Sequence, residues 1–143
     1  MQRNVRQVDV ETGEVLEAGV MVYVQQRPKI REGWMMTFQD GLVRLAQDRS
    51  ITGEQWRVLA YLMGRLDFEN FIYVPQAEVA RALAMQPSHV SRAIAALTSK
   101  RVLVRGPMVG RVGTMRLSHG LGWKGRVRSL QAEQRRHLSV VKR

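Results

Sequence analysis

The chain has 143 residues, of which 45% are hydrophobic and 24% are charged, as expected for one folded globular domain. No apolar run approaches the roughly 20 residues that a membrane-spanning helix needs. The amino terminus lacks the apolar core of a secretory signal, so we expect a cytoplasmic protein. Because cysteine is absent, disulfides and thiolate metal sites are excluded.

The net charge of +11 is concentrated in the second part of the sequence. Residues 1–83 contain ten Lys or Arg and eleven Asp or Glu, whereas residues 84–143 contain thirteen Lys or Arg and a single acid, Glu133. Such an asymmetry is typical of a surface that binds a polyanion, and nucleic acid is the favoured partner. An anionic membrane ranks lower, because the basic residues do not lie on an amphipathic helix with a wide apolar face.

Residues 1–33 are predicted to form a β-hairpin followed by a connector. Val, Leu and Tyr alternate loosely around Thr12 and Gly13, which is the pattern of two strands joined by a turn. The polar segment 27–33 contains Pro28 and Gly33 and is predicted to be a loop.

Two helices are predicted next. The first is predicted from apolar residues at spacings of three and four, namely Met35, Phe38, Leu42 and Leu45. It is expected to end near Asp48. The second opens with Thr52 and Gln55, which have the T-x-x-Q form of a capping box. Its broad apolar face predicts a helix buried in the middle of the domain, and this face consists of Trp56, Val58, Leu59, Leu62, Met63 and Leu66. Trp34 and Trp56 are expected in the core.

A brief strand over residues 71–74 precedes two further helices that have the order of a helix-turn-helix. Pro75 begins the third helix, and Pro87 begins the fourth after a break at residues 84–86. The positions where the two helices meet are apolar or small: Val79, Ala80, Leu83, Met85, Val90 and Ala93. Ala84 stands where glycine often makes the turn, so we expect some backbone strain there.

A basic hairpin is predicted directly after the fourth helix. Two β-rich runs, 102–105 and 114–117, are separated by Gly106, Pro107, Gly110 and Gly113, which gives a glycine-rich tip that carries Arg111. We therefore predict an α+β fold, a winged helix-turn-helix with an N-terminal β-hairpin and a basic C-terminal tail. The expected domains are residues 1–33, 34–118 and 119–143, with a helix around 131–138 in the tail.

The fourth helix has the composition of a DNA recognition helix, because its outer positions are short, polar and free of acids. Arg92 is expected to bind a guanine edge or a phosphate, and Gln86, Ser88, His89 and Ser91 are expected to contact bases or backbone. The remaining DNA contacts are expected from the wing tip and from other basic residues, namely Arg111, Lys100, Arg101, Arg105, Arg116, Lys124, Arg126 and Arg128.

Other classes of function find less support in the residues. His89, His119 and His137 lack the spacing of metal ligands, and no G-x-x-x-x-G-K loop is present, so we expect no enzyme, no metal and no cofactor. RNA binding ranks low because exposed aromatic residues that stack on bases are few. A protein-protein interaction module with the same fold stays open, and weak DNA binding with little salt dependence would favour it.

Three stretches carry a resemblance to a known family. They are TGEQWRVLAYLMGRLDFENFIYVPQAEVARALAM, HVSRAIAAL and, above all, HGLGWKGRV at 119–127. Over residues 34–127 the chain resembles the RepL family of plasmid replication proteins, which are winged-helix DNA binders. The helix-turn-helix part is shared with MarR-like and other winged repressors, and Pro75 replaces the Ser cap that is frequent in the family.

The resemblance implies sequence-specific binding of double-stranded DNA in plasmid replication or its control, with association to the nucleoid or a plasmid. The alternative is transcription regulation, as a repressor of a nearby promoter. Because most such proteins bind twofold sites, we expect a homodimer. Its candidate surface is the hairpin residues 15–24 together with Phe38, Leu42 and Leu45.

Overall fold

The structure is a computed structural model that describes residues 7–8, 15–16 and 33–141, with side-chain surroundings for residues 33–136. The chain divides into two units, Met1–Glu32 and Gly33–Arg143. In the first unit, β1 (Gln7–Val8) pairs antiparallel with β2 (Val15–Leu16), as a hairpin requires. The predicted turn at Thr12 and Gly13 and the connector before Gly33 lie outside the described residues.

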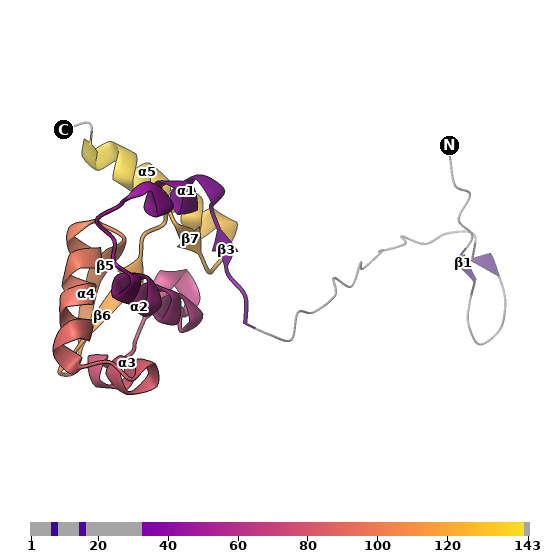
Figure 1. Ribbon diagram of the computed structural model, residues 1–143. Coiled ribbons are helices and arrows are strands. Elements are labelled where there is room, and N and C mark those ends of the chain that lie inside the picture. Colours follow the sequence, from indigo (N-terminus) through magenta and orange to yellow (C-terminus); the bar gives the residue numbers. More distant parts are fainter. Residues whose placement is uncertain (1–6, 9–14, 17–32, 142–143) are drawn as a thin grey trace. The chain divides into compact units, whose positions relative to one another are not determined.

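The second unit is a mixed helix and strand domain with the winged helix-turn-helix arrangement, and this prediction is confirmed (Figure 1). Its helices are α1 (Gln39–Gln47), α2 (Gly53–Gly64), α3 (Gln76–Leu83), α4 (Pro87–Ser99) and α5 (Val127–Val141). An antiparallel sheet has the order β4-β6-β5, formed by β4 (Phe71–Ile72), β5 (Leu103–Val109) and β6 (Val112–Leu117). A short 3-10 helix, η1 (Phe68–Asn70), precedes β4. A separate antiparallel pair joins β3 (Met36–Thr37) to β7 (Gly122–Trp123).

The helix termini follow the local sequence closely, with one exception. Both hydrogen bonds of the predicted capping box are present, because the Thr52 hydroxyl accepts from the Gln55 backbone N–H and the Gln55 side chain accepts from that of Thr52, each at 3.3 Å. The predicted start of the first helix near Met35 is wrong, since α1 begins at Gln39. The preceding residues are extended because β3 pairs with β7 and Phe38 donates its N–H to the Leu121 carbonyl at 2.9 Å.

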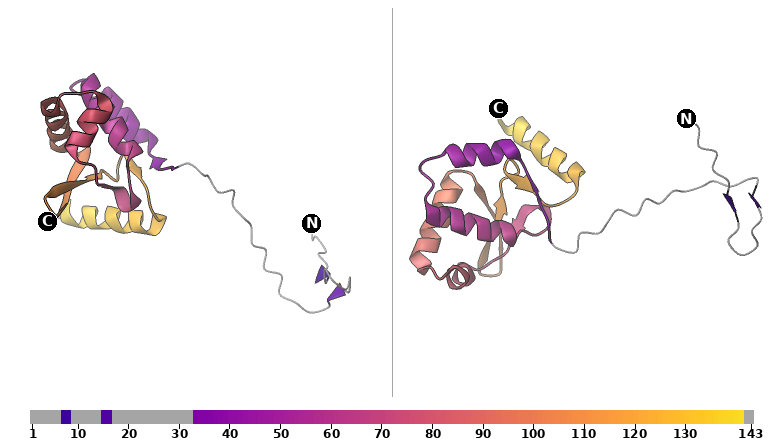
Figure 2. Two further views of the ribbon diagram at one scale, coloured as in Figure 1. Left: turned by 90° about the horizontal axis from the view of Figure 1, so that it is seen from below. Right: turned by 45° about the vertical axis from the view of Figure 1, so that its right-hand side comes forward.

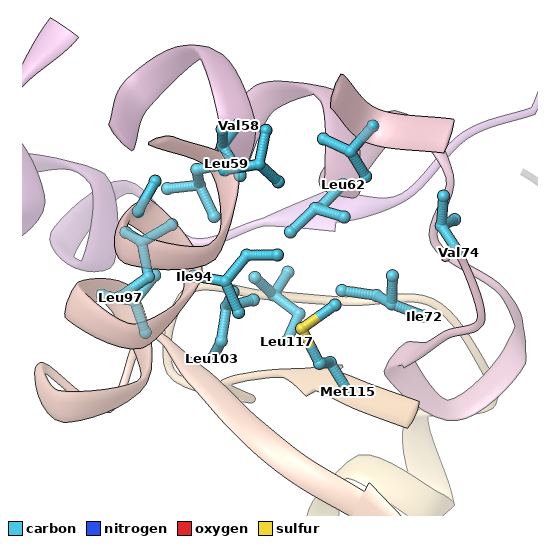
Figure 3. Close-up of a cluster of buried hydrophobic side chains, with 14 of the residues drawn as sticks. Val58, Leu59, Leu62, Ile72, Val74, Ile94, Leu97, Leu103, Met115 and Leu117 are labelled. Atoms are coloured by element: carbon cyan, nitrogen blue, oxygen red, sulfur yellow. The ribbon is translucent and has the colours of Figure 1, made fainter. Parts of the chain in front are cut away.

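The core lies between α2, α4 and the sheet (Figure 3). Val58, Leu59 and Leu62 of α2 are fully buried, which confirms that this helix occupies the middle of the domain. Burial of each such side chain contributes roughly 1.5–3 kcal/mol to folding. Trp56 is partly buried against this core, but the prediction for Trp34 is wrong, because its side chain is 59% exposed.

The sequence predicted a separate C-terminal tail from residue 119 onward. Its described part instead packs into the domain, which corrects this boundary. Trp123 is 1% exposed and Leu130 of α5 is buried. Gly122 lies so close to β3 that an added Cβ would stand 2.7 Å from the Met36 carbonyl oxygen. The helix α5 also begins at Val127, earlier than the expected start near 131, because Leu130 anchors its first turn.

Candidate nucleic-acid interface

The turn between α3 and α4 fixes the orientation of α4. Ala84 makes this turn in the left-handed conformation, with φ 51° and ψ 46°. The Met85 N–H donates to the Ala80 carbonyl at 2.9 Å, which closes the end of α3. Val79 and Val90 are fully buried where the two helices pack. The predicted packing positions of the helix-turn-helix and the predicted strained backbone at Ala84 are both confirmed.

One face of α4 is exposed, polar and free of acids. Gln86, which precedes the helix and makes no side-chain cap, is exposed, as are Ser88, Ser91 and Arg92. The Arg92 Nε donates to the Ser88 carbonyl at 3.4 Å, a long contact that leaves the rest of the guanidinium accessible. This face therefore presents hydroxyl and guanidinium donors of the kind that contact base edges and phosphates.

The hairpin β5–β6 stands beside this face as a wing. Gly110, with φ 61°, and Arg111 form its two-residue tip, and Val109 pairs with Val112 across it. Glycine at the first position of such a tip suits a type II′ turn, which matches the strand twist. Arg111 is exposed, as the sequence predicted.

A groove runs between α4 and the wing. Ser91, Ala95 and Thr98 of α4 form one wall, and Arg105 and Arg111 lie on the wing side. Of the predicted DNA contacts, the structure therefore brings Ser91, Arg105 and Arg111 to a single concave surface, whereas Ser88 and Arg92 do not line it.

Thr98 and Gln76 line this groove and were not identified as site residues from the sequence. Thr98 follows Ser91 by seven positions and Ala95 by three, so helical spacing was a usable signal for its face. Gln76, at the start of α3, also lines the groove, and only the tertiary packing of α3 against α4 places it there.

His89, at the amino-terminal end of α4, contacts α2. Its Nδ1 lies 3.0 Å from the Glu54 carboxylate at the start of α2, and the side chain is partly exposed. The contact ties the amino-terminal end of α4 to α2. The expectation that His89 contacts bases stays a prediction.

Lys100, at the end of α4, is engaged within the protein. Its Nζ donates to the Asp48 carboxylate at 2.9 Å and also to the Ser50 hydroxyl. The hydrogen bond from the Ser50 side chain, followed by that from Lys100, lowers the pKa of Asp48 from 3.8 to about 2. Lys100 therefore connects α4 to the loop between α1 and α2, and its expected contact with phosphate stays a prediction.

Arg116 and Lys124 also donate to backbone carbonyls of the domain, and their expected contacts with DNA stay predictions. The Arg116 guanidinium donates twice to the Glu69 carbonyl, from Nε at 3.2 Å and from Nη2 at 3.0 Å, and lies 5.0 Å from the centre of the Phe71 ring. The Lys124 Nζ donates to the Leu66 carbonyl at 2.7 Å. Buried backbone carbonyls need such partners, so both cations serve the fold.

The other predicted cations are exposed but lie in different places. Arg101, with φ 57°, is in the turn between α4 and β5. Arg126 and Arg128 lie at the start of α5, which occupies the end of the unit opposite α3 in both Figure 1 and the right view of Figure 2. The structure thus does not bring these two arginines to the groove between α4 and the wing.

The net positive charge of the chain comes from the unit that carries this groove. Residues 33–143 contain eighteen Lys or Arg and seven Asp or Glu, a net of +11, whereas residues 1–32 contain five of each. Among the described residues, no group of three or more His, Asp or Glu is placed to hold a metal ion. No helix in the described part of the chain is long and apolar enough to cross a membrane.

Comparison with known proteins finds distant similarity to solved structures, at low sequence identity. No family model matches the sequence, and no curated protein matches it. Among solved structures, the adhesin competence repressor (AdcR) from Streptococcus pyogenes is 16% identical, with a TM-score of 0.41 over 72% of each chain. MepR from S. aureus, solved with ethidium bromide, is 19% identical, with a TM-score of 0.41 over 71% of each chain.

Proposed function

We propose that this protein binds double-stranded DNA sequence-specifically, with the exposed face of α4 in the major groove and the wing tip on the adjacent backbone or minor groove. The observation that supports it most is the exposed, acid-free face of α4, from which Ser91 and Thr98 line one groove with Arg105 and Arg111 of the wing. A fold alone does not define a function, so the proposal depends on the chemistry of this surface.

The surface supplies the two contributions that DNA recognition needs. Arg92, Ser88 and Ser91 offer donors for base edges, and a well-placed pair of hydrogen bonds from arginine to guanine discriminates by about 1–3 kcal/mol. The net charge of +11 on the same unit supplies salt-dependent attraction to phosphates.

For the biological role we propose transcription regulation at a nearby promoter, with plasmid replication or its control as the second candidate. A repressor needs only to occupy its DNA site, and the groove between α4 and the wing is suited to contact with DNA. The replication reading depends on the HGLGWKGRV stretch. Within it, Gly122, Trp123 and Lys124 have packing and hydrogen-bonding roles, which explain these residues without a role in replication.

We also propose that the protein acts as a homodimer without enzymatic activity, in the cytoplasm and associated with the nucleoid or a plasmid. The predicted dimer surface needs revision, because Leu45 is buried in the core and Phe38 is partly buried. Leu42 and Val43 of α1 are exposed, at 37% and 53%, and are large hydrophobic residues of this helix that a second copy could cover, whereas the predicted hairpin residues 17–24 lie outside the described residues. Light scattering should give twice the chain mass at micromolar concentration, and a mass of one chain would contradict the dimer.

The experiment that tests DNA recognition is selection of bound duplexes from a random pool, followed by anisotropy titration of the enriched duplex and a scrambled one at two salt concentrations. We expect an enriched motif that binds far more tightly than the scramble. Its genomic position would separate a promoter from a replication origin. Absence of enrichment with a small salt dependence would favour a protein-protein interaction module instead.

A matched pair of variants tests the reading role of α4. Arg92→Ala should weaken binding to the selected site by about 1–3 kcal/mol and relax the preference at one base position. Arg44→Ala removes the same charge from an exposed position on α1 and should leave the preference unchanged. An unchanged preference in Arg92→Ala would show that α4 does not read bases through this residue.

A further inference from the structure

The outer surface of α5 presents arginines that do not belong to the groove between α4 and the wing. Arg126 directly precedes this helix, Arg128 and Arg135 lie on it, and all three are exposed. Within the described part of the chain, no hydrogen bond or ion pair engages their guanidinium groups, whereas Lys100 and Lys124 are held by internal acceptors. The described fold therefore gives these three arginine side chains no internal role.

The packing of α5 turns two of these arginines outward. Leu130 is buried and Glu133 contacts Arg116 of the sheet, so these two residues mark the inner side of the helix. With about 3.6 residues per turn, Arg128 and Arg135 lie about 140–160° around the helix from Leu130. They are also about two turns apart, which places both on one outer face.

This outer face contains no acid. Gln131 and Ala132 are exposed between the two arginines, and Glu133, the single acid in residues 84–143, is engaged on the inner side. Arg128 and Arg135 are about 10 Å apart along the helix axis, since each residue adds about 1.5 Å. The major groove of DNA is roughly 12 Å wide, so two long side chains at this separation can contact phosphates on both of its sides.

A nucleic acid suits this face better than a lipid membrane does. A helix that lies on a membrane buries a wide apolar face in the lipid. Leu130 of α5 is instead packed inside the domain, and among the described residues of this helix Val127 is the exposed large hydrophobic side chain. Arginines without an apolar stripe are typical of contacts with a phosphate backbone.

The outer face of α5 is also remote from the groove between α4 and the wing. Strand β6 leads from Val112 at the wing tip to Arg116, which contacts Glu133 of α5. Four residues at about 3.4 Å each put roughly 14 Å between the tip and the row of the sheet that α5 contacts. Figures 1 and 2 accordingly show α5 at the end of the unit opposite α3. One unit therefore presents two separate basic surfaces.

We propose that the outer face of α5, formed by Arg126, Arg128 and Arg135, binds the phosphates of a second segment of double-stranded DNA without reading its sequence. A chain that holds one segment in the groove of α4 and another on α5 joins the two segments. The DNA contact of α5 stands by itself, whereas the joining of two segments rests on the proposed function.

The first test is capture of a second duplex. The selected duplex is fixed to beads, saturated with the full chain and washed, and a fluorescent duplex of scrambled sequence is then titrated onto the beads at two salt concentrations. Three phosphate contacts give a salt slope of about −2.7, so a doubling of the salt should weaken capture about sixfold, with the amount of bound chain measured in parallel. No capture above that of beads without the chain would overturn the proposal.

A matched pair of double variants locates the second surface. Arg128→Gln with Arg135→Gln should lower the salt slope of capture by about 1.8 and leave the affinity for the selected duplex unchanged in anisotropy titration. Arg44→Gln with Arg49→Gln removes two exposed arginines, from α1 and the turn that follows it, and should capture the scrambled duplex as the unmodified chain does.

Two results with these variants would contradict the assignment to α5. An equal loss of capture in both, with native circular dichroism spectra, would show attraction to net charge alone. Undiminished capture by the α5 variant would place the second duplex elsewhere, such as in the groove of a second copy.

The same materials separate this proposal from the proposed function and from a membrane surface. If no duplex is enriched by selection, the proposed function fails, and the affinity for the scrambled duplex alone then tests α5. That affinity should fall about tenfold in the α5 double variant and stay unchanged in the Arg44 and Arg49 control, and equal affinities would overturn the surface. Binding of phosphatidylserine vesicles by the chain, without capture of the second duplex, would identify a membrane surface and likewise overturn the proposal.

Discussion

Replacement of Asn70 should strongly destabilise the domain, because its side chain joins three separate segments. Asn70 is 0% exposed, and its Nδ2 donates to the carbonyls of Leu117 at 3.0 Å and Gly122 at 2.8 Å. Its Oδ1 accepts the Lys124 N–H at 2.8 Å. Removal of the amide in Asn70→Ala leaves two buried carbonyls without this partner, at about 1–3 kcal/mol each, and also the partly buried Lys124 N–H. We expect a loss of about 2–6 kcal/mol in the free energy of unfolding, a large share of the roughly 5–15 kcal/mol of a typical domain.

Urea unfolding followed by far-ultraviolet circular dichroism measures this loss, and two further variants separate its causes. Asn70→Gly should be about 1 kcal/mol more stable than Asn70→Ala, because the backbone here has φ 64°. Asn70→Asp keeps the shape but turns an acceptor toward two carbonyl oxygens, so it should be destabilised at pH 7 and less so when the new carboxyl is protonated. Wild-type stability of Asn70→Asp at pH 7 would refute the hydrogen-bond assignment.

Two other changes test features outside this centre. Ala84→Gly should raise the free energy of unfolding by about 0.5–1 kcal/mol, because glycine tolerates φ 51° without the penalty of a Cβ, and a loss of stability in urea unfolding would contradict the strained turn. The lowered pKa of Asp48, about 2 against 3.8, means that its ionised form stabilises the fold above pH 4 and that this contribution disappears as the pH falls toward 2. The urea midpoint of the unmodified chain should therefore fall over that range more steeply than that of Asp48→Asn, and identical profiles would show that the contacts with Ser50 and Lys100 add nothing.

The helices and the wing were predictable because their signals are local. The Thr52 capping box, the Pro87 start and the glycine-tipped hairpin each depend on residues within a few positions of one another, and backbone hydrogen bonding translates such spacing directly into structure. The apolar period of α2 likewise identified the buried helix. The acid-free face of α4 was also readable, because helical spacing shows which residues share a face.

The partners of individual cations were decided only by the tertiary structure. Lys100 meets Asp48, Arg116 meets the Glu69 carbonyl and Lys124 meets the Leu66 carbonyl, over separations of 52, 47 and 58 residues. Sequence shows that a long basic side chain is present but not which buried acceptor comes within its reach. Composition therefore determined that this protein has a strongly basic domain, whereas the three-dimensional packing decided which of its cations stabilise the fold and which stay available at the groove of α4 and the wing.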